Sequence, residues 1–106
     1  MQAERIHTGR RGEELAAEHL AVSGYQIIGR NVQCGHGEVD IIAWDNETLC
    51  FVEVRTKENT LHGPPLETVD TAKQRRICAS ASRYMTRWNG PWPELRFDVI
   101  GIVLDE

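Results

Sequence analysis

Two alternating runs of residues around a short polar turn most constrain the fold of this chain. The runs cover residues 38–44 and 49–55, and the polar residues 45–48 separate them. Alternation of apolar and polar residues on both sides of turn residues predicts a β-hairpin. A two-residue turn at Asn46 and Glu47, or a four-residue loop over residues 45–48, gives the same antiparallel register, in which paired residue numbers sum to about 93.

That register gathers charged side chains on one face of the hairpin. Asp40 faces Glu53 and Glu38 faces Arg55, and alternation puts all four on the same side of the sheet. Facing carboxylates repel each other, so this pair needs a compensating positive charge, which a divalent cation would supply. The alternative is a solvated face that carries ordinary surface charges.

The apolar residues of the hairpin favour a covered charged face over a solvated one. Three apolar residues share the face of the carboxylates: Ile42, Leu49 and Phe51. The opposite face is almost wholly apolar and carries Val39, Ile41, Ala43, Cys50, Val52 and Val54. We therefore expect both faces of the hairpin to be packed against other elements.

Length and composition predict one small domain. A chain of 106 residues with 41% hydrophobic content can bury one core. We expect a flexible leader over residues 1–8 and a single α/β domain over residues 9–106. The chain has no apolar run of membrane-spanning length, no signal-peptide pattern at its start, and three widely spaced cysteines, which together predict a cytoplasmic protein without a membrane partner.

The first helix is predicted from Gly9 or Arg10 to Ser23, with Gly24 as its C-terminal cap. A strand over residues 25–32 and a turn over residues 33–37 lead into the hairpin. Glycine and proline predict a loop over residues 56–66, which could act as a substrate-contacting flap.

A second helix is predicted over residues 68–88, with Thr68 or Asp70 as its cap, and a last strand over residues 95–104. Its inward stripe is formed by Ile77, Ala81, Tyr84, Met85 and Trp88. The order helix, three strands, helix, strand predicts an α/β fold with a mixed sheet, in which the second helix is the crossover to the last strand.

Each predicted helix carries one charged residue on its apolar stripe. Glu13 precedes Ala16, Ala17 and Leu20 by three, four and seven residues, so it lies on the buried side of the first turn. It could stabilise the helix N-terminus or point at the charged face of the hairpin. Lys73 stands four residues before Ile77 and either has a role in the site or extends its ammonium group to solvent.

The distribution of charge matters more than the total. A formal net charge of −4 argues against unspecific nucleic-acid binding through bulk positive charge. Residues 71–88, however, contain five basic side chains and no acidic one: Lys73, Arg75, Arg76, Arg83 and Arg87. A basic face beside carboxylates suits a metal-dependent phosphodiesterase, whereas a solvated helix face is the alternative for Arg76, Arg83 and Arg87.

Four motifs resemble a known family. They are G-x-x-G-E at residues 9–13, G-E-V-D at 37–40, F-V-E-V-R-T-K at 51–57 and R-F-D-V-I at 96–100. In this order they resemble the YraN-type predicted endonucleases, which are distantly similar to archaeal Holliday junction resolvases in the restriction-endonuclease-like superfamily. The resemblance covers residues 9–103 and implies a restriction-endonuclease-like αβββαβ core.

The resemblance also implies a site and an activity. Asp40 and Glu53 would bind Mg²⁺ or Mn²⁺ with the main-chain carbonyl of Val54, while Glu13 would be an additional carboxylate and Lys73 the helix lysine of the catalytic set. Such a site would hydrolyse phosphodiester bonds in structured or branched DNA. The residues expected to contact the nucleic acid are Arg10, Lys57, Lys73, Arg75 and Arg76.

One residue departs from the family pattern. Arg55 occupies the catalytic position two residues after Glu53 where a lysine is expected. An arginine can neutralise a phosphate but has a pKa above about 12, so it does not accept a proton from water. Lys57 or Lys73 could replace the lysine.

Two functions remain open on this basis: a metal-dependent endonuclease, or a non-catalytic nucleic-acid-binding or regulatory protein that keeps the nuclease fold. A sugar or nucleotide hydrolase using Glu38 and Glu53 is a more remote third. Whether the chain forms a homodimer is also left open.

Overall fold

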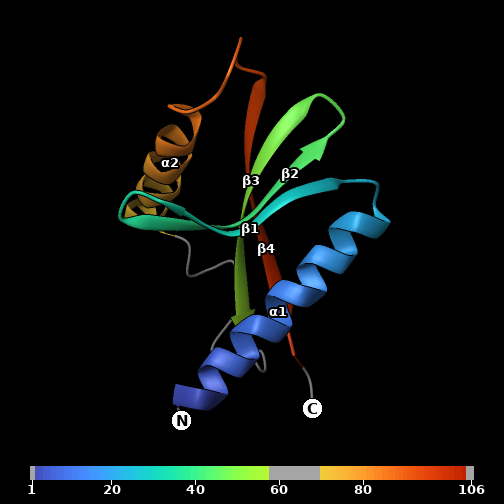
Figure 1. Ribbon diagram of the computed structural model, residues 1–106. Helices are drawn as coiled ribbons and strands as arrows, with labels where there is room; N and C mark the ends of the chain where they lie inside the picture. Colours follow the sequence, from blue (N-terminus) through green and yellow to red (C-terminus); the bar gives the residue numbers. More distant parts are fainter. Residues whose placement is uncertain (1, 58–69, 105–106) are drawn as a thin grey trace.

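The computed structural model describes residues 2–57 and 70–104, with side chains from residue 10 onward. Its helices and strands follow the predicted order (Figure 1): α1 (Gln2–Val22), β1 (Gln26–Cys34), β2 (Gly37–Asp45), β3 (Thr48–Lys57), α2 (Thr71–Met85) and β4 (Glu94–Val103). The predicted α/β class and the αβββαβ order are confirmed, and both are consistent with a restriction-endonuclease-like core.

The sheet is mixed and has the strand order β1-β2-β3-β4. β1, β2 and β3 are antiparallel neighbours, whereas β4 pairs with β3 in parallel after the crossover through α2. The hairpin register is the predicted one, since Ile41 pairs with Val52 and Asp45 with Thr48. The connection is the two-residue turn, in which Asn46 has a φ of 56°, as such turns require of their first residue.

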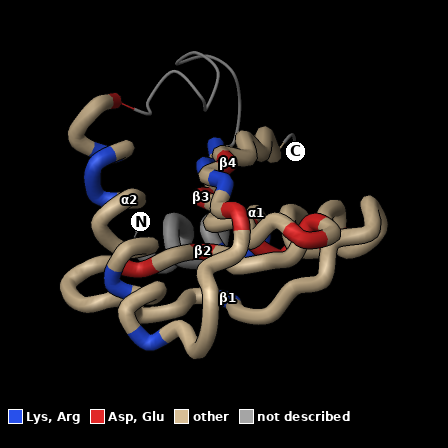
Figure 2. Tube along the Cα trace, turned by 90° about the horizontal axis from the view of Figure 1, so that it is seen from above, with Lys and Arg blue, Asp and Glu red and all other residues tan. Residues whose placement is uncertain are grey.

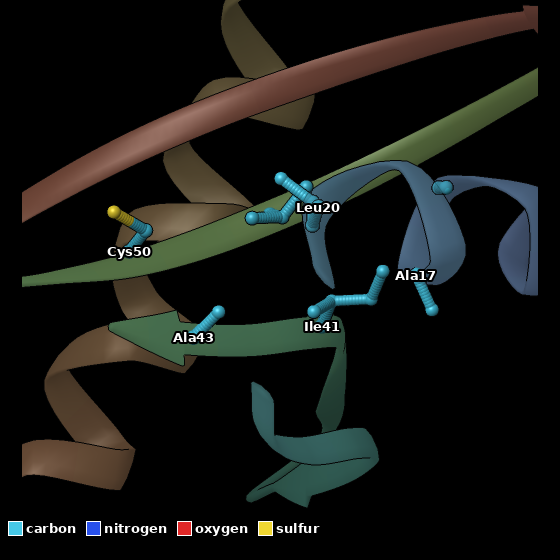
Figure 3. Close-up of a cluster of buried hydrophobic side chains, with 7 residues drawn as sticks. Ala17, Leu20, Ile41, Ala43 and Cys50 are labelled. Carbon is cyan, nitrogen blue, oxygen red and sulfur yellow. The ribbon is translucent and has the colours of Figure 1, made fainter. Parts of the chain in front are cut away.

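The two helices cover opposite faces of the sheet and bury two hydrophobic clusters (Figure 1). On one face, α1 contributes Ala16, Ala17 and Leu20, which pack on Ile41, Ala43, Cys50 and Val52; Figure 3 shows several of these side chains meeting. On the other face, Ala81 and Met85 of α2 pack on Ile42, Leu49 and Phe51. The carboxylate-bearing face is therefore covered, as its apolar residues predicted.

The first helix begins earlier than predicted. It starts at Gln2 rather than at Gly9 or Arg10, so part of the segment expected to be a leader is helical. The sequence before residue 9 has no apolar stripe and so gave no periodic signal. It does include Gln, Ala, Glu and Arg, whose intrinsic propensity for helix is high. The predicted end is close, because the helix stops at Val22 and Gly24 has a φ of +96°.

Other boundaries also shift by a few residues. β1 runs on to Cys34, which shortens the predicted turn to Gly35 and His36. β3 continues through Thr56 and Lys57 beside β4, so the following loop begins later than expected. The rest of that loop, with the proposed flap and Thr68, lies outside the described residues.

The second helix is shorter than predicted and is capped by Asp70. The Asp70 carboxylate accepts a hydrogen bond from the Lys73 backbone N–H at 2.8 Å, which confirms one of the two predicted caps. The helix ends at Met85 instead of residue 88, although Trp88 still packs against the same cluster as Met85. No helix among residues 2–57 and 70–104 has the length and apolarity needed to cross a membrane.

Candidate metal and phosphodiester site

The candidate site lies where β2 separates from β3. The ladder between these strands runs from Asp45 back to Ile41 and stops there, so the predicted pairs Asp40–Glu53 and Glu38–Arg55 do not form. Beyond this point β3 keeps β4 as its partner, while β2 continues beside β1 alone. A two-stranded ribbon twists more strongly than a wide sheet, which explains why this part of the hairpin departs from the predicted pairing.

The same separation explains a wrong assignment of Val39. Alternation along the strand predicted that Val39 packs with Ile41, but Val39 joins the cluster beneath α2. Figure 1 shows the β1–β2 turn lying beside α2, where a Cβ on Gly37 would collide with the Ser80 hydroxyl. The twist of the ribbon therefore carries this end of β2 under the second helix.

Asp40 occupies the opening between the strands. Its Oδ2 accepts a hydrogen bond of 2.7 Å from the Val54 backbone N–H, which would otherwise lack a partner where the ladder ends. In a strand, the N–H and C=O of one residue point in the same lateral direction. The Val54 carbonyl therefore points into the same opening as the Asp40 carboxylate.

Four carboxylates from three elements act on one another at this opening. Burial raises the pKa of Asp40 most, and the charges of Glu53, Glu13 and Glu38 raise it further, while the Val54 hydrogen bond opposes them. The result is an Asp40 pKa of about 7, against an ordinary value of 3.8. Asp40 is thus partly protonated at neutral pH in the absence of a cation.

Glu53 is matched by positive side chains from two elements. Lys73 of α2 places its Nζ 3.3 Å from Glu53 Oε1, and Arg55 Nη1 lies 3.9 Å from the same oxygen. The Glu53 side chain is only 12% exposed, so these contacts are weakly screened by solvent. Lys73 therefore lies beside a hairpin carboxylate, on the inward side of α2 where helical periodicity predicted it.

Asn31 links two of the carboxylates and was missed by the sequence analysis. With its amide nitrogen turned toward them, Asn31 donates to Glu13 Oε2 at 3.0 Å and to Glu38 Oε1 at 3.2 Å. Asn31 also has a φ of 50°, and β1 shifts register between Ile27 and Gly29. A glycine followed by asparagine two residues later, inside the strand, was the available sign of such an irregularity, because both residues are disfavoured in strands.

Glu13 reaches this group from the interior of α1. Its helix begins eleven residues earlier, at Gln2, so a stabilising role at the helix N-terminus is excluded for Glu13. Gly12 allows the close approach, because a Cβ there would overlap the Thr56 side chain of β3. Glu13 therefore points at the charged face of the hairpin, as its other interpretation predicted.

A hollow of about 310 Å³ opens above these groups, and we call it the carboxylate hollow. The charged residues that line it are Glu38, Asp40, Glu53, Lys73 and Arg76. Within the described ranges, no three His, Cys, Asp or Glu side chains are already gathered around a point where a metal ion could sit. Carboxylates and ammonium or guanidinium groups share this hollow.

Comparison with known proteins assigns the family. Residues 12–102 match the family described as Uncharacterised protein family UPF0102. The chain belongs to the UPF0102 family. All of the carboxylates described above, from Glu13 to Glu53, lie within the matched range.

Several curated UPF0102 proteins are similar to this chain. One from Chlorobaculum tepidum is 44% identical over 95 residues, which cover 90% of this chain and 74% of that protein. One from Symbiobacterium thermophilum is 48% identical over 94 residues, with coverage of 89% and 80%. One from Chlorobium chlorochromatii is 49% identical over 94 residues, with coverage of 89% and 72%.

The basic residues predicted to contact nucleic acid do not all lie together in this UPF0102 chain. Lys73 and Arg76 line the carboxylate hollow. Lys57 belongs to β3 and, by alternation, shares the side of Glu53 and Arg55. Arg10 and Arg75 are exposed, and neither lines that hollow.

The R-F-D-V-I motif at residues 96–100 holds elements together rather than joining the carboxylates. Arg96 donates to Asp45 at 2.9 Å and to Asp98 at 3.0 Å, and its Nη2 donates to the Tyr25 hydroxyl at 2.7 Å. These bonds tie β4 to the end of β2 and to Tyr25, the residue just before β1. Arg96 and Asp98 are therefore structural residues of this fold.

Proposed function

We propose that this UPF0102 protein is a metal-dependent endonuclease that hydrolyses phosphodiester bonds in structured or branched DNA, as its resemblance to YraN-type predicted endonucleases implies. The observation that carries the proposal is the opening between β2 and β3. There Asp40 and Glu53 line one hollow, the Val54 N–H bonds Asp40, and Lys73 and Arg55 stand beside Glu53. This combines oxygen donors for a cation with positive groups for a phosphate.

The oxygen donors fit Mg²⁺ or Mn²⁺ by their chemistry. Mg²⁺ prefers oxygen ligands, keeps several waters and is commonly held through only one or two carboxylates. Asp40 uses Oδ2 for the Val54 N–H, which leaves Oδ1 for a cation, and Glu53 offers a second carboxylate. The raised pKa of Asp40, which comes first from burial and then from the neighbouring carboxylates, also fits, because a cation would compensate both effects.

The protein side chains would divide the work of hydrolysis. A bound divalent cation supplies an activated water and neutralises charge on the phosphate. Asp40, Glu53 and the Val54 carbonyl would hold it, while Asn31 holds the neighbouring carboxylates of Glu13 and Glu38 through its amide. Lys73 and Arg55 would orient and neutralise the scissile phosphate, for which both a compact ammonium and a planar guanidinium are suited.

A second candidate function is a non-catalytic nucleic-acid-binding or regulatory protein with the same fold. The observation that favours it is Arg55, because a guanidinium does not accept a proton from an attacking water. Lys73 Nζ lies 3.3 Å from Glu53 Oε1, so Lys73 is a lysine that could take over this role. Metal-dependent cleavage separates the two candidates.

Single-turnover cleavage of four-way-junction and flap DNA in Mg²⁺ or Mn²⁺ tests the proposal. Wild type should cleave slowly, and Asp40→Asn should abolish cleavage because it removes a cation ligand. Arg55→Lys should accelerate cleavage, by as much as about 10²-fold if the ammonium assists proton transfer. Arg11→Lys is the matched control, because the same substitution at an exposed α1 position outside the carboxylate hollow should leave the rate unchanged.

Folded protein that binds DNA but shows no metal-dependent cleavage, either as wild type or as Arg55→Lys, would refute the nuclease and favour the binding protein. Equal rates for wild type and Asp40→Asn would show that any activity comes from elsewhere. Circular dichroism of each variant establishes that a lost activity is not lost folding.

A further inference from the structure

The carboxylate hollow continues into a longer groove between α2 and the β1–β2 turn. A second hollow of about 420 Å³ shares three residues with it: Gly37, Arg76 and Ser80. A third hollow of about 540 Å³ shares three residues with the second: Cys34, Gly35 and Arg83. We call this continuous surface the α2 groove.

The sign of the charge changes along the α2 groove. Acidic side chains line only its first hollow, whereas arginines recur along its whole length at Arg76, Arg83 and Arg87. Figure 2 shows basic positions recurring on α2. Among residues 10–57 and 70–104, none of these three arginines takes part in an ion pair.

The three arginines are spaced along one wall. At 1.5 Å per helical residue, Arg83 lies about 10 Å beyond Arg76, and Arg87 follows just past the end of α2. Arg83 is close to the opposite wall, since a Cβ on Gly35 would lie 3.1 Å from its Nε. The turn therefore supports this guanidinium within the groove, while Arg75, one residue before Arg76, leaves the helix about 100° away and lines none of the three hollows.

Aromatic rings form part of the wall at the far end. Tyr84 and Trp88 line the third hollow beside Arg83 and Arg87, and their ring centroids lie 6.4 Å apart. Trp88 also meets Trp44 edge to face at 5.9 Å, which holds its ring in place. Guanidinium groups that follow a backbone, together with rings that accept a base, are the combination that binds single-stranded nucleic acid.

We propose that the α2 groove binds an unpaired strand of the substrate and leads it to the carboxylates, an inference that rests on the proposed nuclease function. Phosphates contact Arg76, Arg83 and Arg87, and a base packs against Trp88. A base within a duplex is stacked on its neighbours and offers no free ring face, so only an unpaired base can make this contact. The preferred substrate is therefore a branched DNA with a single-stranded arm beside the cleavage position.

Binding without metal tests the groove separately from cleavage. Fluorescence anisotropy in EDTA compares a short thymine oligonucleotide with a duplex of equal length. The oligonucleotide should bind more tightly and quench tryptophan fluorescence. Arg83→Gln and Arg87→Gln should each weaken its binding about tenfold, as expected for one charged hydrogen bond, and lower the salt slope by about 0.7.

Arg11→Gln is the matched control, because it removes the same charge from an exposed position on α1, outside the three hollows. The affinity of this variant for the oligonucleotide, and the salt dependence of that affinity, should equal those of wild type. Trp88→Leu should abolish the quenching while Trp44 and Trp92 remain, and its thermal unfolding reports any loss of folding. The arginine variants decide the outcome if Trp88→Leu does not fold.

Three results would refute the proposal that the α2 groove binds an unpaired strand. They are tighter binding of the duplex, equal effects of Arg11→Gln and Arg83→Gln, and binding of poly-glutamate as tight as that of the oligonucleotide, which would indicate an acidic protein partner. Absence of cleavage with intact, Arg83-dependent oligonucleotide binding would instead refute hydrolysis and leave the groove as a strand-binding site.

Discussion

Asp40 combines a structural and a chemical role in one side chain. It supplies the hydrogen-bond acceptor that Val54 lacks where the strands part, yet burial and three neighbouring carboxylates raise its pKa to about 7. The pKa of an unfolded aspartate is about 3.9. Between about pH 4 and pH 7 the folded protein therefore holds a proton that the unfolded chain releases, so the free energy of unfolding falls as pH rises through this window.

Asp40→Asn should remove this dependence and stabilise the metal-free protein. Its amide oxygen can still accept from the Val54 N–H, but it carries no charge. We expect a gain on the order of 1 kcal/mol above pH 7, less than the full pKa shift implies because solvent screens a partly exposed group, and almost no gain near pH 4. Urea unfolding across this range measures it.

Asp70→Asn serves as the control for that experiment. Asp70 is exposed, and asparagine caps helices about as well as aspartate does. This variant should keep the wild-type decline in stability with pH. A wild-type protein whose stability does not fall between pH 4 and pH 7 relative to Asp40→Asn would contradict the raised pKa.

At the scale of elements, the contact between α1 and β3 fixes the height of Glu13 above the sheet. Gly12 is buried against Thr56, and the nearest atoms of Thr56 leave no room for a Cβ. In an exposed helix, Gly→Ala stabilises by about 1 kcal/mol. At this contact Gly→Ala should instead destabilise the protein, because the added Cβ would overlap Thr56.

We therefore predict that Gly12→Ala lowers the free energy of unfolding by about 1–3 kcal/mol, the range for overpacking. Thr56→Gly removes all three of the nearest atoms, so Gly12→Ala should cost much less in that background. A double-mutant cycle by thermal or urea unfolding measures the coupling. Additive effects of the two substitutions would show that the helix does not rest on Thr56.

Elements could be predicted wherever a local rule decides them. The turn residues fixed the register of the hairpin, and helical periodicity put Glu13 and Lys73 on the faces that meet it. The parting of β2 from β3 was not predictable, because it depends on the twist of a two-stranded ribbon and on packing beneath α2. That is why Val39 was assigned to the wrong face and Asn31 was overlooked.

At the scale of the whole molecule, a cation held by Asp40 and Glu53 would link β2 to β3 and relieve the repulsion that the carboxylates of Glu13 and Glu38 add. Mg²⁺ must displace the Asp40 proton, so its affinity should rise with pH through about 7. A ligand that binds only the folded state raises its stability by mass action. We therefore expect Mg²⁺ to raise the melting temperature more at pH 8 than at pH 6.

Thermal unfolding with and without millimolar Mg²⁺ at both pH values tests this linkage, with Asp40→Asn as the variant that should not respond. Asp45→Asn, outside the carboxylate hollow, should respond as wild type does. An equal rise in melting temperature for wild type and Asp40→Asn would indicate that the cation binds elsewhere on this acidic protein.

The hydrogen bond from Val54 to Asp40 also gives the protein an internal spectroscopic probe. Most amides in the centre of this sheet donate to carbonyl oxygens, whose charge does not change with pH. The Val54 amide donates to a carboxyl group whose charge does change. Its nuclear magnetic resonance frequency therefore follows the protonation of one side chain and would follow the arrival of a cation in the same way, even when no substrate is known.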